Sequence, residues 1–171
     1  MRNIFISLFI FISFSTANAS LLIDPYVGVG LLKTTFDVNS LDNTDDGKLN
    51  ALGARLGYQF FLVSAGVDYS KGSDEDSEFT NTSFFVGVDL PILLRVWAEY
   101  FISSDLDIDE DNLDSPIFLD GTSLGVGFTG LPFISLNLEL QNLNYESKIA
   151  GNKFDLNTAA YLFSVSLPLN L

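Results

Sequence analysis

Charged side chains are the groups in this sequence best able to bind ions or take part in chemistry, and acids far outnumber bases. The chain of 171 residues has 22 Asp and Glu residues against 8 Lys and Arg residues, with no histidine and no cysteine. Without imidazole or thiol groups, the common nucleophile–base pairs, Cys/His zinc sites and disulfide scaffolds are excluded. The net charge of −14 argues against nucleic acid as a partner, because phosphate binding needs a basic surface.

One group of charged residues falls within apolar stretches of the chain. It consists of Arg55, Asp68, Asp89, Arg95, Glu99 and Glu139. Each of these residues stands where apolar and other residues alternate, so we expect all six on the non-apolar face of β-strands. Such charges could select ions in a narrow pore, or they could pair with one another and fill the interior of a barrel. The small interior of an eight-stranded barrel favours the paired network.

A second group of acids gathers in four polar segments, 37–48, 71–80, 103–120 and 146–155. The densest run consists of Asp105, Asp107, Asp109 and Asp111. Carboxylate oxygens at this density are suitable calcium ligands, but the spacing departs from the EF-hand loop with its terminal glutamate. We therefore favour a solvated acidic surface over a dedicated calcium site. Divalent cations that bridge this surface to lipopolysaccharide phosphates are an intermediate case.

Eight segments of alternating residues must position these charges. They run over 25–32, 51–59, 61–70, 83–90, 92–101, 123–129, 134–141 and 158–169. In each segment one set of alternate residues is apolar, while the other set is small, polar or charged. A helical period near 3.6 would mix the two sets, so the pattern indicates strands with two different faces.

The connections between the segments predict how the strands are arranged. Short links near 59–60, 90–91 and 131–132 alternate with the four long acidic segments, as in an antiparallel meander with all long loops at one end. Segments of about ten residues match tilted strands that cross a membrane. An open sheet edge in lipid would leave backbone groups unpaired. We therefore predict an all-β fold, a closed eight-stranded antiparallel up-and-down transmembrane β-barrel.

The beginning of the chain has the pattern of a secretory signal peptide. Arg2 precedes an apolar run from Ile4 to Phe14, and Ala17-Asn18-Ala19 supplies small residues for signal peptidase. An N-terminal membrane anchor is the alternative, but the apolar run is too short to span a bilayer. We expect a signal peptide at residues 1–19 and the barrel domain at residues 20–171.

The composition of the two faces predicts which one meets lipid. The non-apolar face is rich in glycine and serine and carries charges of both signs, which suits a narrow closed interior. The apolar face, with tyrosines near several segment ends, suits contact with hydrocarbon. A secreted, soluble lipocalin-like barrel that carries a ligand is the alternative. It would need the opposite arrangement, with an apolar interior and a polar exterior.

The end of the chain is apolar at every second position. These positions are Tyr161, Phe163, Val165, Leu167, Leu169 and Leu171. The pattern resembles the C-terminal assembly signal of bacterial outer-membrane barrels, although the usual last residue there is Phe. With the signal peptide and eight strands, the chain resembles the small OmpA/OmpX-like outer-membrane β-barrels along nearly its whole length. The resemblance implies localisation in the outer membrane, with loops facing the exterior and the barrel insertion machinery as a partner.

Function is less clearly indicated than fold. Enzymatic barrels of this size, such as lipid A palmitoyltransferases and deacylases, rely on histidine with serine, and this chain has no histidine. We expect no catalysis and no cofactor. The leading hypothesis is a monomeric structural or surface-interaction protein that contacts outer-membrane lipid, lipopolysaccharide, divalent cations or other cells. A narrow ion or small-solute pore is the alternative, and a soluble ligand carrier is the second.

Overall fold

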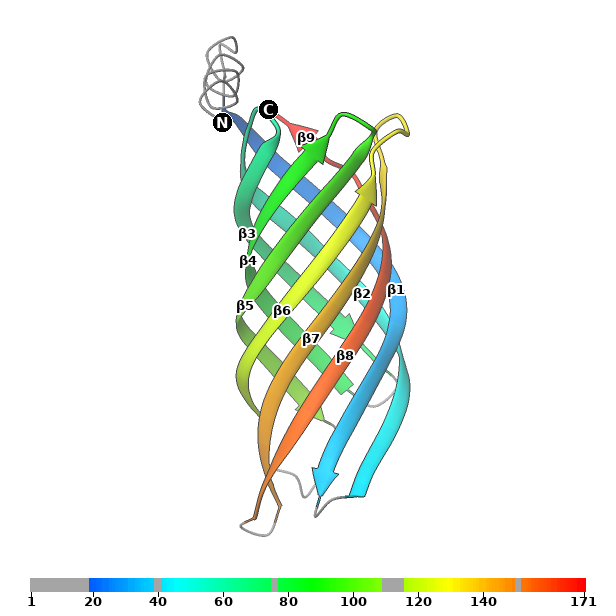
Figure 1. Cartoon of the computed structure of the whole chain (residues 1–171), viewed down its shortest axis with the longest axis vertical. Helices are drawn as coiled ribbons and strands as arrows, with labels where there is room; N and C mark the ends of the chain where they lie inside the picture. Colours follow the sequence, from blue (N-terminus) through cyan, green and yellow to red (C-terminus); the bar gives the residue numbers. More distant parts are fainter. Residues whose placement is uncertain (1–18, 39–40, 75–76, 109–115, 150–151) are drawn as a thin grey trace, which may run out of the picture.

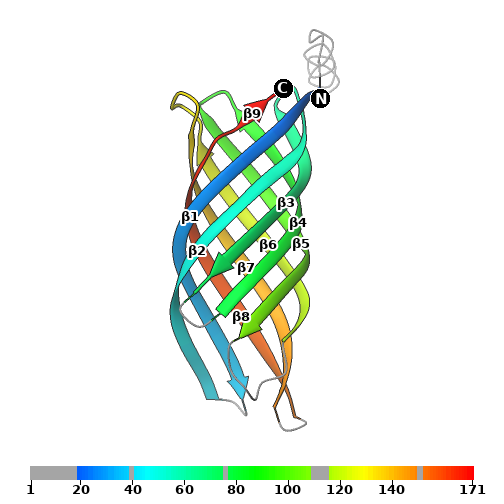
Figure 2. The same ribbon diagram turned by 180° about the vertical axis from the view of Figure 1, so that it is seen from behind.

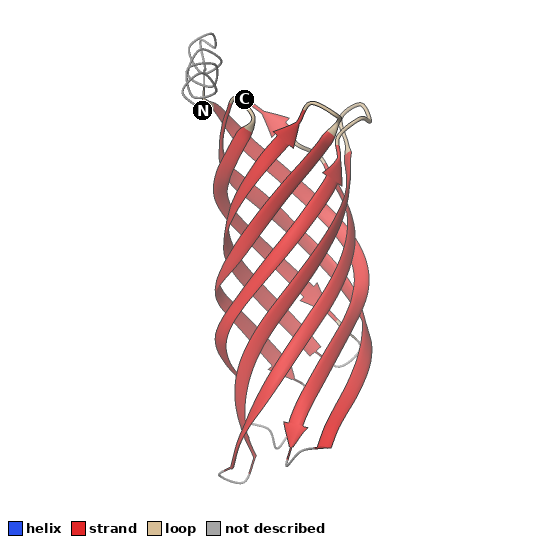
Figure 3. Ribbon diagram, viewed as in Figure 1, coloured by secondary structure: helices blue, strands red, loops and turns tan. Residues whose placement is uncertain are grey.

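The computed structural model describes residues 19–38, 41–74, 77–108, 116–149 and 152–171, and these form one sheet that closes on itself (Figure 1). The strands are β1 (Ser20–Val38), β2 (Leu41–Phe60), β3 (Val63–Ser73), β4 (Ser77–Leu90), β5 (Leu94–Ile108), β6 (Ile117–Phe128), β7 (Ser135–Ile149), β8 (Asn152–Ser166) and β9 (Leu169–Asn170). Strands and their connections make up the whole described chain (Figure 3). In the described ranges no helix is long and apolar enough to cross a membrane.

Antiparallel pairing of β1 with both β2 and β8 closes the barrel. The short strand β9 continues the last strand after Pro168, which has no N–H to donate, and it pairs with β1 at Leu22 and Ile23. Leu21 and Leu171 then exchange two backbone hydrogen bonds of 2.8 and 2.9 Å. The predicted closed eight-stranded up-and-down barrel is therefore confirmed, with β9 completing the eighth strand.

The two ends of the barrel differ in their connections (Figures 1 and 2). Ser20, the end of the chain and the short connections β2–β3, β4–β5 and β6–β7 lie at one end, which we call the turn end. The hairpins β1–β2, β3–β4, β5–β6 and β7–β8 lie at the other end, which we call the hairpin end. The expected signal peptide falls outside the described residues except for its last residue.

The long acidic loops that we expected at the hairpin end are mostly strand. β1 and β2 continue pairing as far as Val38 and Leu41, within the predicted loop 37–48. β5 continues to Ile108 and β6 begins at Ile117, within the predicted loop 103–120. The expectation was wrong because an antiparallel ladder satisfies its own backbone groups and therefore does not require apolar side chains to continue. Many acidic residues thus stand on strand extensions.

The alternating pattern sorts the side chains as predicted. On β1, Val27, Val29 and Leu31 point outward and are exposed, while Tyr26 points into the barrel and is buried. The inner face of the same strand also carries Asp24, which is 1% exposed. This alternation brings the charged residues of different strands into one enclosed interior.

Candidate functional site

The centre of the barrel interior is organised around Arg55 of β2, whose side chain is almost completely buried. Its Nη2 lies 2.7 Å from Glu139 Oε2, and its Nε lies 3.2 Å from Glu99 Oε1 and 3.1 Å from Asp68 Oδ2. A longer ion pair of 3.8 Å joins Nη1 to Asp24 Oδ2. One guanidinium thus holds carboxylates from four other strands, β1, β3, β5 and β7.

Two aromatic rings complete the environment of this guanidinium. The Cζ atom of Arg55 lies 4.9 Å from the centroid of the Tyr26 ring and 4.3 Å from that of the Trp97 ring, within the range of cation–π attraction. The Trp97 ring lies across the backbone of Gly125, its partner on β6, where a Cβ atom would overlap the ring. A glycine at this position therefore makes room for the tryptophan in a narrow interior.

Strand register explains part of this arrangement. Asp24, Arg55 and Asp68 stand directly opposite one another on β1, β2 and β3. Opposite residues on antiparallel strands have Cβ atoms about 5 Å apart, so their side chains meet without spanning the interior. Glu99 and Glu139 come from β5 and β7 and reach Arg55 across the interior, because an eight-stranded barrel is narrow enough for long side chains to touch.

Neutral side chains supply further hydrogen bonds to the same carboxylates. Ser83 Oγ donates to Glu99 Oε2 at 3.1 Å, and Tyr26 Oη donates to Asp68 Oδ1 at 3.0 Å. Ser123 Oγ and Gln141 Nε2 both donate to Glu139 Oε1, at 2.9 and 2.7 Å. Buried charges are tolerated when they are paired and hydrogen-bonded in this way. The arrangement is suited to holding a fixed ionic network.

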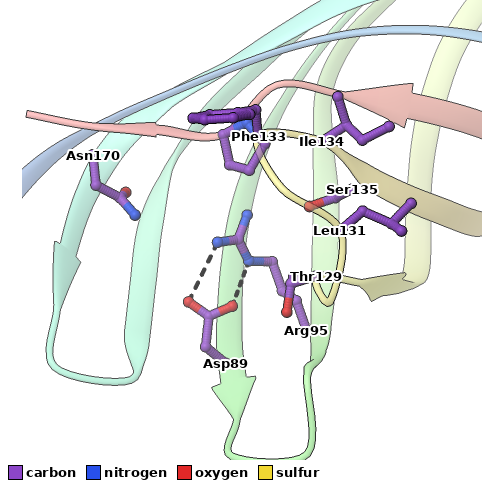
Figure 4. Close-up of a pocket in the computed structure, with 9 residues that line it drawn as sticks. Asp89, Arg95, Thr129, Leu131, Phe133, Ile134, Ser135 and Asn170 are labelled. Carbon is purple, nitrogen blue, oxygen red and sulfur yellow. Dashed lines mark hydrogen bonds and ion pairs between the residues drawn. The ribbon is translucent and has the colours of Figure 1, made fainter.

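A second cation lies closer to the turn end. Arg95 Nε donates to Asp89 Oδ1 at 2.6 Å and Nη2 donates to Oδ2 at 3.3 Å (Figure 4). Arg95 Nη1 lies 3.4 Å from Asp24 Oδ2. Gln59 Nε2 also donates to Asp89, at 2.7 Å. Asp24 therefore links the two guanidinium groups. The Arg95–Asp89 pair borders a cavity of about 230 Å³ whose other walls include Leu131 and Phe133.

Apolar side chains fill the interior between this network and the hairpin end. One cluster is built on Tyr26, Leu49, Phe79, Ala160 and Leu162. A second is built on Phe101, Leu143, Tyr145 and Leu156, and Leu106 packs against both clusters. The tyrosine of the second cluster keeps its hydroxyl 2.6 Å from Ser104 Oγ. Towards the hairpin end the interior is therefore largely apolar, and the buried polar pair Asn81 and Ser104 within it is hydrogen-bonded.

The structure places all six interior charges of the sequence prediction inside the barrel, and it shows which of them pair. Arg95 and Glu99 are four residues apart on β5, about 13 Å along a strand, so they do not meet as neighbours on one face. Arg95 turns to Asp89 and Asp24, while Glu99 turns to Arg55. Asp24 was not among the predicted interior charges, although it stands two residues before the inward-facing Tyr26 and therefore lies on the same face of β1.

Only part of the acidic cluster lies within the described residues. The side chain of Asp105 is exposed on β5 near the hairpin end. For Asp107 only the backbone is described, and Asp109 and Asp111 fall outside the described residues. In the described ranges, no three Asp, Glu, His or Cys residues are grouped so that they could hold a metal ion.

The C-terminal alternating residues lie on the outer surface of the barrel. Tyr161 and Phe163 of β8 are exposed, as are Leu167, Leu169 and Leu171 beyond it. Val165 is half-buried on the same face. All six side chains thus contribute to the apolar exterior next to the closing seam with β1.

Comparison with solved structures identifies the fold. The structure of Neisserial surface protein A aligns with a TM-score of 0.56 at 12% identity, covering 88% of this chain and 98% of that one. Ail of Yersinia pestis, in complex with a heparin analogue, aligns with a TM-score of 0.47 at 9% identity, covering 86% and 99%. OprG of Pseudomonas aeruginosa aligns with a TM-score of 0.47 at 7% identity, covering 89% and 97%.

The similarity to Neisserial surface protein A confirms the predicted architecture. No protein-family model matches the sequence, and no curated protein matches it either. The chain has the fold of the small outer-membrane β-barrels, and the outer-membrane localisation predicted from its sequence agrees with that fold.

Proposed function

We propose that this outer-membrane barrel acts through its hairpin end as a structural or surface-interaction protein, and that it neither conducts solutes nor catalyses a reaction. The apolar outer surface supports insertion into lipid, since Val27, Leu52, Phe84 and Leu138 are exposed on strands spread around the barrel. Exposed apolar surface of this extent is unfavourable in water and favourable against hydrocarbon.

The observation that carries the proposal is the filled interior. The Arg55 network occupies the middle of the barrel, and the two apolar clusters occupy the part towards the hairpin end. A continuous water path would have to pass both regions. Because the interior side chains contact one another, partners have no access through the interior. The hairpin end is the part of the barrel that we propose is available to them.

Conductance measurements in planar lipid bilayers distinguish the closed interior from a narrow pore. We expect the folded barrel to give no single-channel steps in either sodium or calcium salts. Parallel gels, run with and without boiling, show whether the same preparation is folded, because folded barrels migrate anomalously until heated. Reproducible conductance steps from a folded preparation would overturn the closed interior and support the pore.

The acidic hairpin end is the proposed contact surface, with divalent cations bridging it to lipopolysaccharide phosphates. Carboxylates and phosphates share a preference for calcium and magnesium ions. The variant has four substitutions in the acidic run: Asp105→Asn, Asp107→Asn, Asp109→Asn and Asp111→Asn. We expect it to lose most calcium-dependent binding to lipopolysaccharide vesicles while the barrel still assembles.

A matched variant distinguishes a local contact from general surface charge. It neutralises the same number of acids in another segment: Asp37→Asn, Asp42→Asn, Asp45→Asn and Asp46→Asn. Greater loss in the first variant supports a contact at the 105–111 run, and equal loss in both supports a diffuse acidic surface. If both variants bind like the native chain, the acidic end is not the contact surface.

A further inference from the structure

The three short connections at the turn end carry large apolar residues in an unusual backbone conformation. Phe61, Leu93 and Phe133 have φ angles of 58°, 61° and 68°, in the left-handed region. Their exposed fractions are 59%, 55% and 85%. We call these three residues the turn rim. Figure 4 shows Phe133 in the β6–β7 connection, beside the cavity that Arg95 and Asp89 border.

The turn rim is unlike a set of turns that faces water. Such turns use Gly, Asn, Asp or Ser, which tolerate the left-handed backbone and form hydrogen bonds with solvent. Here the segments 60–63, 90–94 and 128–135 contain no charged residue. Further exposed apolar residues, Ile92 and Leu131, stand beside the rim. The chemistry of this surface therefore matches an apolar or interfacial environment.

The height of the apolar outer surface gives an independent argument. On β3 the outward apolar residues run from Val63 to Tyr69 and are followed by the exposed Lys71. Six residue steps at about 3.4 Å, tilted by about 40°, correspond to a height of only about 16 Å. Outer-membrane barrels carry an apolar band of about 25 Å. Counting from Phe61 to Tyr69 gives eight steps and about 21 Å.

The same shortfall occurs on the other side of the barrel. On β7 the outward apolar residues end at Leu140, and the next outward residue is the exposed Asn142. From Leu136 to Leu140 the strand supplies about 10 Å of height, and the count from Phe133 to Leu140 reaches about 18 Å. On both strands the turn rim extends the apolar surface towards the usual thickness.

We propose that the turn rim is embedded in the phospholipid leaflet at that end of the barrel, at the boundary between acyl chains and headgroups, and is not exposed to the periplasm. The rim is continuous with the apolar surface of the strands, so lipid that covers the strands also reaches the turns. This inference rests on the proposed membrane insertion. The embedded turn rim would set the depth of the barrel in the membrane. The charged residues on the outside of the strands would then lie towards the hairpin end.

Single-cysteine labelling tests the depth directly, because the native chain has no cysteine. The test variant is Leu93→Cys, and the matched control is Leu119→Cys on β6 towards the hairpin end, since the two leucines are 55% and 54% exposed. Leu138→Cys marks the middle of the apolar surface. Each variant is labelled with a nitroxide and reconstituted in phosphatidylcholine vesicles, and the accessibility of the label to oxygen and to a water-soluble nickel complex is measured.

We expect the label at position 93 to be several-fold less accessible to nickel than the label at position 119, and closer to the label at position 138. Equal nickel accessibility at positions 93 and 119, with position 138 shielded, overturns the embedded rim and leaves the membrane barrel intact. Nickel access at position 138 as well contradicts membrane insertion itself. Gels with and without boiling establish that each labelled variant is folded.

Oxidative footprinting of the unlabelled native chain in the same vesicles provides a second measurement. Hydroxyl radicals generated in water should oxidise Leu119 and spare Phe133, although Phe133 is the more exposed of the two in the protein alone. The result that overturns the proposal is oxidation of Phe133 at the level seen for the protein in urea.

Discussion

At the scale of single residues, Arg55 is the side chain on which the interior depends most. It is the common partner of Asp24, Asp68, Glu99 and Glu139, which come from four different strands. Buried carboxylates are stable only when they are paired, since desolvation of an isolated charge is very costly. The arginine therefore determines whether these acids can remain charged inside the barrel.

Replacing Arg55 with methionine should destabilise the barrel strongly. The substitution Arg55→Met leaves several buried carboxylates without their cation, and breaking a buried ion pair on one side costs about 3–5 kcal/mol. Urea unfolding in lipid vesicles, followed by the fluorescence of Trp97, measures the change. The exposed Lys33→Met variant is the control, with an expected effect within about 0.5 kcal/mol. Similar unfolding of the two variants would mean that the network contributes little to stability.

At the scale of elements, each long strand combines a part with an apolar outer face and a part with a polar outer face. On β7, Leu138 and Leu140 point outward and are exposed, and the outward residue that follows is Asn142. The inner face changes as well, from the polar Asn137, Glu139 and Gln141 to the apolar Leu143 and Tyr145. Towards the hairpin end the strands thus form a barrel with an apolar core and a polar exterior.

An arginine placed on the outer face of β7 should distinguish these two parts. Leu138→Arg puts a charge against hydrocarbon, and it should reduce the free energy of unfolding in vesicles by about 2–4 kcal/mol. Asn142→Arg on the same face should change it by less than about 0.5 kcal/mol. The comparison uses urea titrations of both variants in the same lipid. If Leu138→Arg is as stable as Asn142→Arg, position 138 does not face hydrocarbon.

At the scale of the whole molecule, three zones follow one another along the barrel axis. The turn end is apolar and uncharged in its connections, the middle has an apolar exterior around an ionic interior, and the hairpin end has a polar exterior around an apolar interior. Each zone places its apolar side chains where water is absent, either against lipid or against one another. This order favours one orientation of the barrel in a membrane.

The location and folded state of the protein can be measured together. The outer-membrane fraction of expressing cells, compared on gels with and without boiling, should contain a band that changes mobility on heating. The closed antiparallel ladder is the physical reason, because it resists detergent until it is melted. A mature chain that is free in the periplasm and shows no heat-dependent shift would contradict membrane insertion and support the soluble carrier.

The pattern of residues along the chain was enough to predict the strand faces, the closed barrel and the polar interior. Alternation with a period of two is a local property, so the inward positions of Arg55, Asp68 and Glu139 follow from their neighbours in the chain. The need to pair every backbone group in lipid then leaves closure as the consistent arrangement. These predictions required no knowledge of which strands face one another across the interior.

Which charges meet and where the strands end became known from the three-dimensional arrangement of the strands. Glu99 reaches Arg55 and Arg95 reaches Asp24 because register and barrel curvature bring distant strands within side-chain reach, and spacing along one strand contains no such information. The acidic segments form extensions of the strands because cross-strand hydrogen bonds outweigh the weak preferences of Asp and Asn for turns. Contacts between strands are non-local, and this is the physical reason that the sequence pattern could not predict them.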